Sequence, residues 1–428
     1  MIDIKLIRET PEIVKENIKK KFQDEKLPLV DEVIQLDQKW RNKKKDADNL
    51  RRDRNDVSEK INLLMKSKKT NEAKELIKKA KDIANQIEQI EVDESKLEEQ
   101  IKSIMMKIPN IIDKSVPIGK NDTENVEIER IGEPIVPKYE ILNHVELLEK
   151  FDGADFNTAA SVSGNGFYYL KGDFARLHSS LMSYARDFMI ENGFTYCIPP
   201  FMIRSLAVDG VMSFAEKGAM MYKIEGEDLY LIGTSEHSMI AMFKDKTLKK
   251  NELPKTLTSY SPCFRKEVGA HGIEQKGIYR VHQFEKEEMI VVCEPENSPE
   301  WYEKMLNLTV QFFRSLNVPV RKLECCSGDL ADLKIKSCDV EAWSPRQKKY
   351  FEVGSCSNLS DAQARRLGIK INGPKGNYFA HTLNNTVVAT PRALIAVMEN
   401  NQNKDGTINI PKVLQPYMGG KKIIGKSN

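Results

Sequence analysis

Residues 264–267 (FRKE) and residues 280–288 (RVHQFEKEE) decide how the larger part of this 428-residue chain folds. Both segments place charged residues in apolar, strand-like surroundings, and the loop between them contains Gly269, Gly272 and Gly277. Two strand-like segments joined by a glycine-bearing loop predict an antiparallel hairpin. We therefore expect a hairpin within a larger antiparallel sheet.

The hairpin brings charged and aromatic side chains together. Side chains alternate along a strand, so Arg265 shares a face with Glu267, and Phe284 shares a face with Glu288. If the two faces coincide, they present a cation, an aromatic ring and carboxylates in one place. The planar fork of an arginine can hold a phosphate, and an aromatic ring can stack on a base. An exposed hairpin with paired charges is an equally good interpretation of this segment alone.

A third segment, residues 383–389 (LNNTVVA), predicts a strand that leads into an apolar helix ending near Asn400. Thr390 is a suitable N-cap for this helix, and Pro391 suits its first position. Arg392 then lies in the first turn, where the helix dipole disfavours a cation. A cation beside free helix amides indicates an anion site, such as one for phosphate. A surface arginine there is the alternative, since it costs only about a few tenths of a kcal/mol.

The other segments beyond residue 140 complete the prediction of an α+β fold. Strand-like runs at 167–170, 229–232 and 289–292 lie between helical ones. Strands outnumber strand–helix–strand units, which favours a mainly antiparallel sheet with helices. The sequence contains neither GxGxxG nor GxxxxGK followed by Ser or Thr, so nucleotide binding of the Rossmann or P-loop kind is not supported.

The first third of the chain predicts a helical hairpin. Hydrophobic residues recur in steps of three and four from Val33 to Leu64 and again from Ala73 to Ile108. This period is typical of a coiled coil, and the polar stretch at 67–71 marks the turn between two antiparallel helices. Two helices of roughly 35 residues would form an arm roughly 50 Å long.

Charge is unevenly distributed along this arm. Residues 51–81, around the turn, contain 11 Lys or Arg and 5 Asp or Glu. A basic tip on a long rod suits contact with a nucleic-acid phosphate backbone. Coiled coils are always rich in charge, so a solvated helix face is the more economical interpretation of this stretch taken alone.

Composition limits the remaining possibilities. The chain is 40% hydrophobic and 30% charged with a net charge of +3, which excludes disordered, collagen-like and disulfide-framework proteins,. Its seven cysteines include no CxxC pair, so we expect reduced thiols in a reducing compartment,. Cys325, Cys326 and Cys338 lack zinc-ligand spacing, and we expect no structural metal.

The sequence also predicts the domain boundaries and the cellular location of the protein. Prolines at 109, 117, 134 and 137 indicate a connecting segment, which divides the chain into an arm (1–110), a linker (111–140) and a larger domain (141–428),. No apolar stretch reaches the about 20 residues of a membrane span, and the first residues lack a signal peptide. We expect a cytoplasmic protein without membrane contact.

Taken together, these segments resemble the seryl-tRNA synthetases of the ordinary, coiled-coil-arm type, over nearly the whole chain. Three class II signatures occur in order, at 193–200, at 264–267 and at 390–392. Residues 234–236, 280–284 and 352–358 are similar to the serine enzyme in particular, and 231–237 to its archaeal members. The resemblance implies a class II antiparallel sheet core preceded by a tRNA-binding arm, and a homodimer built around residues 193–200.

The resemblance also implies a set of site residues. Arg265, Glu267 and Arg392 would serve catalysis by contacting ATP. The further ATP contacts would be Lys266, Val281, Phe284, Glu352, Val353, Gly354 and Ser355. Glu352 and Ser355 would hold Mg²⁺, and no zinc is expected. The serine pocket would consist of Thr234, Ser235, Glu236, Glu288, Asn384 and Thr386. The tRNA contacts of the arm would be Arg51, Arg52, Arg54, Lys74, Lys78 and Lys79. Gly354 stands where many members of the family have Ser.

The implied activity is that of an ATP-dependent serine–tRNA ligase. The serine carboxylate attacks the α-phosphorus of ATP, pyrophosphate leaves, and tRNA(Ser), or tRNA(Sec) where one exists, takes the seryl group. Catalysis by positioning and electrostatics explains why arginines dominate the site. Two alternatives are an amino acid:carrier-protein ligase, whose relatives lack the long arm, and a catalytically inactive paralogue acting as a binding protein.

Overall fold

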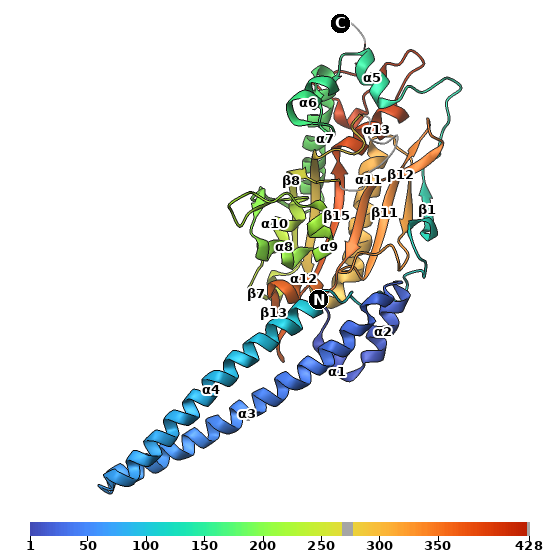
Figure 1. The fold of residues 1–428 in the computed structure, drawn as a ribbon. Coiled ribbons are helices and arrows are strands. Elements are labelled where there is room, and N and C mark those ends of the chain that lie inside the picture. Colours follow the sequence, from blue (N-terminus) through green and yellow to red (C-terminus); the bar gives the residue numbers. More distant parts are fainter. Residues whose placement is uncertain (268–276, 426–428) are drawn as a thin grey trace. The chain divides into compact units, whose positions relative to one another are not determined.

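The computed structural model describes residues 1–267 and 277–425, so Gly269 and Gly272 of the hairpin loop lie outside the described residues. The chain divides into two compact units, one of residues 2–19 and 23–109, the other of residues 110–428 with 1 and 20–22 (Figure 1). In the described ranges, no helix is long and apolar enough to cross a membrane.

The first unit is a helical arm. It consists of α1 (Ile4–Glu9), α2 (Pro11–Lys20), η1 (Asp24–Lys26), α3 (Leu27–Lys66) and α4 (Thr70–Met105). Ion pairs from Lys43 to Asp93 and from Arg51 to Glu91 join α3 to α4 and require the two helices to run antiparallel. The helices are slightly longer than expected, and the turn at 67–69 lies where the sequence predicts it. The predicted coiled-coil arm is confirmed.

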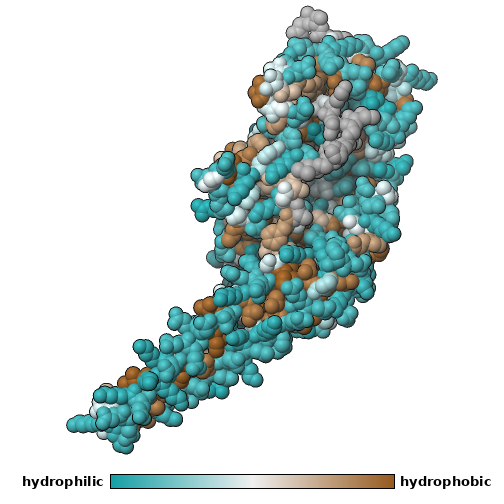
Figure 2. Space-filling model, viewed as in Figure 1, coloured by the Kyte–Doolittle hydropathy of each residue, from teal (hydrophilic) through white to brown (hydrophobic). Residues whose placement is uncertain are grey.

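Hydrophobic residues of the arm pack along the seam between α3 and α4. Val57, Ile83 and Ile87 are buried there. On the face of the arm that Figure 2 shows, hydrophilic side chains predominate and hydrophobic ones are seen along its length, the pattern expected when one stripe of each helix is buried,. Arm stability therefore comes from this stripe.

The second unit is built on an eight-stranded sheet, with the strand order β1-β10-β11-β12-β15-β9-β8-β4. All neighbours pair antiparallel except β4 with β8. The strands are β1 (Val126–Ile131), β4 (Thr195–Tyr196), β8 (Lys255–Phe264), β9 (Gln283–Cys293), β10 (Val320–Glu324), β11 (Lys336–Ser344), β12 (Lys349–Asn358) and β15 (His381–Ala389). The predicted antiparallel sheet is confirmed. Strand β1 lies within residues 111–140, so the expected linker contributes an edge strand.

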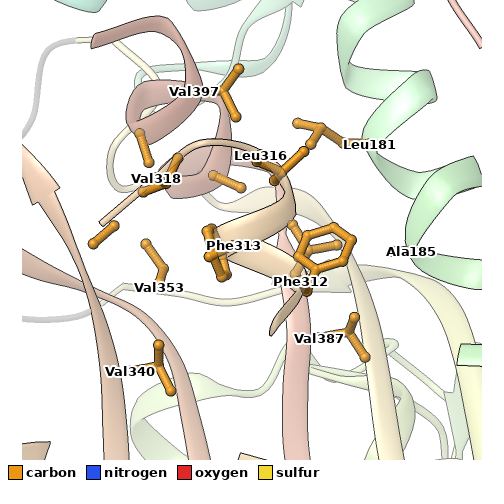
Figure 3. Close-up of a cluster of buried hydrophobic side chains, with 14 of the residues drawn as sticks. Leu181, Ala185, Phe312, Phe313, Leu316, Val318, Val340, Val353, Val387 and Val397 are labelled. Atoms are coloured by element: carbon orange, nitrogen blue, oxygen red, sulfur yellow. The ribbon is translucent and has the colours of Figure 1, made fainter. Parts of the chain in front are cut away.

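Three helices cover one face of this sheet. They are α7 (Gly172–Glu191), α11 (Ser298–Ser315) and α13 (Thr390–Asn400). The core between them and the strands is apolar: Phe312 and Phe313 of α11 contact the inward-facing valines of β11, β12 and β15 (Figure 3). The opposite face of the same strands is therefore left for polar groups.

Smaller elements surround this framework. They are η2 (Asp122–Glu124), α5 (His144–Lys150), β2 (Ala154–Asp155), α6 (Phe156–Ser163), β3 (Tyr169–Leu170), β5 (Met202–Ile203), α8 (Ser205–Val211), α9 (Phe214–Met220), β6 (Tyr230–Leu231), α10 (Ser235–Ala241), β7 (Thr247–Lys249), η3 (Lys250–Glu252), η5 (Pro295–Asn297), α12 (Ala362–Leu367), β13 (Lys370–Gly373), β14 (Gly376–Phe379), β16 (Ile408–Asn409), η6 (Lys412–Leu414) and β17 (Ile423–Ile424). Helix α10 packs against β8 and β9, and α8 packs against α10 and α12. These helices lie beside the polar face and enclose part of it.

Candidate active site

The β8–β9 hairpin has a register that unites its two polar faces. Cys263 pairs with Phe284, so Arg265, two residues beyond Cys263, lies on the same side as the Phe284 ring,. The Arg265 guanidinium is 5.3 Å from the centre of that ring, and its Nε donates to the carbonyl of Gly233 at 3.1 Å. The faces coincide, as the chemistry of a nucleotide site requires.

A β-bulge in β12 brings Glu352 and Ser355 to this same face. Glu341 pairs with Glu352 and Val340 pairs with Gly354, which leaves Val353 as an extra residue. Residues three apart on a regular strand point to opposite faces, but the extra residue reverses the alternation. The Val353 side chain is buried in the core, so it offers the cavity only its backbone.

A second bulge, at Val387 in β15, likewise keeps two residues that are three apart, Thr386 and Ala389, on the polar face. Thr386 pairs with Glu288, and Ala389 pairs with Lys286. Alternation along β9 then places Lys286 between Phe284 and Glu288 on the polar face. The structure thus aligns an aromatic ring, a cation and a carboxylate along one strand.

A cavity of about 140 Å³ lies over the phosphate-binding candidates. Its lining includes, of the predicted residues, Arg265, Glu267, Val281, Phe284, Glu352, Val353, Gly354, Thr386 and Arg392. Arg392, in the first turn of α13, donates from Nη1 to Glu352 Oε2 at 2.8 Å and to the Glu352 carbonyl at 3.1 Å. Its position in the first turn is as predicted. Thr390 is the first helical residue rather than the N-cap, and its hydroxyl donates to the carbonyl of Glu285 at 3.0 Å.

The Arg392–Glu352 pair affects the protonation of two neighbouring carboxyl groups, Glu352 and Asp339. Burial would raise the pKa of Glu352, but the charge of Arg392 and its hydrogen bond hold that pKa below the usual range. Burial together with the Glu352 charge raises the pKa of Asp339, the residue that pairs with Ser355 across β11 and β12. Of these two carboxyl groups, Glu352 is therefore the one that ionises more readily.

A second cavity, of about 260 Å³, adjoins the first. Its lining includes Thr234, Glu236, Glu288, Ser355, Asn384 and Thr386, and it shares Arg265, Lys286, Glu352 and Thr386 with the first cavity. The Thr234 hydroxyl donates to Glu288 Oε2 at 2.9 Å, and Lys286 Nζ lies 2.5 Å from the same oxygen. The cavity is small, polar and rich in carboxylates.

Glu236 has an unusual protonation equilibrium. Burial, followed by the charge of Glu288, raises the pKa of Glu236 to about 7. His237, next in sequence, also lines this cavity, and burial lowers its pKa to about 3, so its imidazole is neutral. A bound cation would favour the ionised form of Glu236.

Two residues predicted for the site lie outside both cavities. The hydroxyl of Ser235 donates to the carbonyl of Ser259 at 3.0 Å, and Ser235 is fully buried. Lys266 lines neither cavity. Its backbone N–H donates to the carbonyl of Met220 at 3.0 Å. In the arm, Arg51 is engaged with Asp48 and Glu91, whereas Arg52, Arg54, Lys74, Lys78 and Lys79 are exposed.

Sequence reasoning missed several residues of the site. Lys286, Tyr279 and Arg280 line the first cavity, and Lys334 lines the second. Lys286 alternates with Phe284 and Glu288, so the period of the strand was a sufficient signal for it. Tyr279 and Arg280 precede β9, and Lys334 lies in a connection between β10 and β11, where periodicity gives no signal.

The residues present fit a magnesium ion bound together with nucleotide phosphates. Within residues 1–267 and 277–425, no three His, Cys, Asp or Glu side chains are grouped to hold a metal. Mg²⁺ needs fewer protein ligands, because it is usually held by one or two carboxylates, waters and substrate phosphates. Glu352 and Ser355 share one face and supply a carboxylate and a hydroxyl oxygen, the hard ligands that Mg²⁺ prefers,.

One hairpin of the antiparallel sheet carries an arginine and an aromatic ring, Arg265 and Phe284. A second arginine, Arg392, stands at the start of α13, the helix that follows β15. This arrangement defines a class II aminoacyl-tRNA synthetase. Residues 221–401 match the family described as tRNA synthetase class II core domain (G, H, P, S and T). Residues 1–112 match the Seryl-tRNA synthetase N-terminal domain. The chain belongs to the seryl-tRNA synthetase family.

Individual relatives agree with this assignment over their full length. A protein of Methanocella arvoryzae named serine--tRNA ligase is 43% identical over 427 residues, which cover 99% of this chain and 100% of that protein. The crystal structure of seryl-tRNA synthetase from Pyrococcus horikoshii complexed with ATP has a TM-score of 0.93, 40% identity and full coverage of both chains. The cytoplasmic enzyme of Naegleria fowleri, in complex with AMP, has a TM-score of 0.88 at 34% identity, covering 100% of this chain and 99% of that chain.

Proposed function

We propose that this chain activates L-serine with ATP in the two adjoining cavities and then transfers the seryl group to tRNA(Ser). As a member of its family it is an ATP-dependent serine–tRNA ligase. The residue assignments rest on one observation. The two cavities adjoin, and both are lined by Arg265, Lys286, Glu352 and Thr386. A carboxylate in one cavity and an α-phosphate in the other would meet there.

The first cavity is assigned to ATP. Phe284 stacks on adenine, with Val281 beside it, and Glu267 contacts the nucleoside. Arg265 holds the α-phosphate at the junction, and Arg392 holds the terminal phosphate at the start of α13. Arginines suit both positions because the guanidinium fork matches phosphate oxygens and stays charged throughout. Mg²⁺, held by Glu352 and Ser355, would neutralise phosphate charge as pyrophosphate departs.

The second cavity is assigned to serine. Glu288 and Thr386, paired across β9 and β15, with Asn384 alongside, face the side-chain hydroxyl. Thr234 and Glu236 receive the ammonium group. A site that pairs its buried polar groups with a hydroxyl rejects alanine, because binding alanine would leave those groups unpaired.

Adenylate formation at this junction needs no proton transfer by the protein. The serine carboxylate attacks the α-phosphorus in line, forming the acyl–phosphate bond, while the bond to the β-phosphate oxygen breaks and pyrophosphate leaves. The terminal ribose hydroxyl of tRNA then attacks the acyl carbon and loses its proton to solvent, while the bond from that carbon to the phosphate oxygen breaks and AMP departs. The protein contributes orientation and positive charge, from Arg265, Lys286 and Arg392.

The rest of the chain is assigned to tRNA binding and to dimer formation. Residues 1–110 form the tRNA-binding arm and 141–428 form the catalytic domain. Of the segment 111–140 between them, β1 adds a strand to the catalytic sheet and the rest connects the two parts. We place the enzyme in the cytoplasm as a homodimer. Transfer to tRNA(Sec), in an organism that has one, uses the same site.

Transfer of labelled serine to total tRNA, with ATP and Mg²⁺, tests this proposal. We expect RNase-sensitive label from serine, and no competition from alanine, threonine or glycine at equal concentration. Label on a protein acceptor would indicate a carrier-protein ligase, and absence of label on any acceptor would indicate an inactive paralogue.

Substitution Arg392→Ala tests the phosphate site. We expect serine-dependent pyrophosphate exchange to fall by at least about 100-fold, since removing one charged contact to the reacting phosphates costs several kcal/mol. Circular dichroism should show an unchanged fold, because Arg392 lies at a cavity and not in the core. Near-normal exchange in the variant would remove Arg392 from the reaction.

A further inference from the structure

Gln363 is a fully buried side chain of α12 that reaches the serine-side cavity through Glu236. Its Nε2 donates to Glu236 Oε1 at 2.9 Å and to the carbonyl of Val211 at 3.0 Å. Its Oε1 accepts from the hydroxyl of Thr382 at 2.7 Å. Gln363 and Thr382 are both 0% exposed.

These three bonds fix which way the amide points. An amide group can be turned over, which exchanges its donor and its acceptor. The Val211 carbonyl can only accept, so it requires the amide nitrogen on its side,. The amide oxygen then faces Thr382, whose hydroxyl can donate to it. One N–H of that nitrogen is then committed to the Glu236 carboxylate.

We propose that Gln363 is a positioning residue for serine binding, which holds one oxygen of Glu236 and leaves the other for the serine ammonium group. This inference rests on the proposed assignment of Glu236 to the ammonium group. A buried N–H donor favours a carboxylate over a carboxylic acid, so the amide both orients Glu236 and favours its ionised form.

The charges around Glu236 explain why losing the hydrogen bond from Gln363 would change its ionisation. Glu288, on β9, opposes ionisation of Glu236, while Lys286 on the same strand and Lys334, in the connection before β11, favour it. His237 is neutral, and the hydrogen bond from Gln363 also favours ionisation. Because burial already raises the pKa of Glu236 to about 7, loss of the donor would carry that pKa above neutrality.

The test is Gln363→Met, which keeps the length of the side chain and removes its donors. The KM for serine and the KM for ATP are measured by pyrophosphate exchange from pH 6 to pH 9. We expect the serine KM to rise about tenfold at pH 7, the loss typical of a charge-assisted hydrogen bond, and to return toward the wild-type value at pH 9. The ATP KM and kcat should stay within about twofold.

Two further variants separate the outcomes. Leu367→Ala also removes a buried side chain from α12, and Leu367 packs near Gly210 of α8. It should lower the melting temperature without a pH-dependent change in serine KM, and the same pH-dependent change in Leu367→Ala would overturn the proposal as a packing effect. If Glu236→Gln raises the serine KM while Gln363→Met does not, only the role of Gln363 is wrong. If neither variant alters it, the assignment of Glu236 fails as well, and the role of Gln363 with it.

Discussion

Glu236 is the residue whose protonation most directly affects serine binding. Its pKa is raised to about 7, so in the absence of substrate the carboxyl is protonated below that pH. The serine ammonium group binds the ionised form, and the serine KM of the wild-type enzyme should therefore rise as pH falls through about 7. The check is the serine KM by pyrophosphate exchange across pH 5.5–8.5. A serine KM that stays flat over this range would contradict the assignment.

Gly354 stands at a position with little room for a side chain. A Cβ at this position would lie 3.2 Å from Thr309 Cγ2 and 3.2 Å from the Thr386 carbonyl oxygen. Thr309 already donates to that oxygen at 2.7 Å, which fixes the backbone behind the serine-side cavity. The close approach therefore favours glycine here.

We expect Gly354→Ser to lower the free energy of unfolding by about 1–3 kcal/mol, the usual range for overpacking. Denaturant unfolding measures the change. Thr309→Ser, which keeps the hydroxyl and removes Cγ2, should recover part of the loss in the double variant. Equal stability of Gly354→Ser and wild type would show that Thr309 and Thr386 move aside freely.

Some site residues could be predicted from local sequence, and others could not. Arg265 and Arg392 break local rules, one as a charge directly after an apolar strand and one as a cation at a helix start, and both lie at the first cavity. Gln363 breaks no local rule, because its partners Glu236, Val211 and Thr382 come from three separate elements. Such a residue is found only from the tertiary structure.

At the scale of elements, strand alternation predicted the β8–β9 faces correctly, but the same rule fails in β12. Glu352 and Ser355 are three apart and should face opposite ways on a regular strand. The bulge at Val353 corrects the phase. A bulge depends on how the neighbouring strand pairs, which the β12 sequence does not reveal by itself.

The arm helices carry a prediction about tRNA. Charge reversal of the exposed Lys74, Lys78 and Lys79 on α4 should raise the KM for tRNA at least about tenfold and weaken its dependence on salt, because each lysine lost removes a phosphate contact. Pyrophosphate exchange should be unchanged. Residues 82–100 of the same helix contain seven Asp or Glu and one lysine, Lys96, which is the matched control for charge reversal. A tRNA KM that stays the same in the triple variant would remove the arm tip from tRNA binding.

The whole molecule divides much as its sequence pattern suggests, into a heptad-bearing arm and an α+β unit. The exception is β1, whose residues 126–131 lie in the segment expected to be a linker yet pair with β10. Its sequence, VEIERI, is charged and short, as is usual for an edge strand that must not recruit another chain. The prolines on either side of it, at 109, 117, 134 and 137, made the segment look like a connection,.

Assembly is the prediction for the whole molecule. Ile190, Ile198 and Met202, near the first class II signature, are 47%, 74% and 49% exposed in the single chain. These three residues lie within 13 positions of the sequence, and exposed apolar residues that form a patch mark an interaction surface. We expect a dimer in analytical ultracentrifugation, and a monomer with greatly reduced aminoacylation for Ile198→Asp, since an exposed position tolerates the change in a folded chain. The control is Val162→Asp, another exposed apolar residue, 66% exposed in α6. A wild-type protein that sediments as a monomer would contradict the prediction.

Strand β9 also limits the distance between the two ends of an inhibitor that binds this site. Phe284 and Glu288 lie on one face of a regular strand, four residues and therefore about 14 Å apart along its axis,. A rigid strand cannot stretch to follow its ligand. A molecule meant to imitate the aminoacyl adenylate must place its base and its hydroxyl at that interval, and a linker even one bond too long would force it to give up one of the two ends.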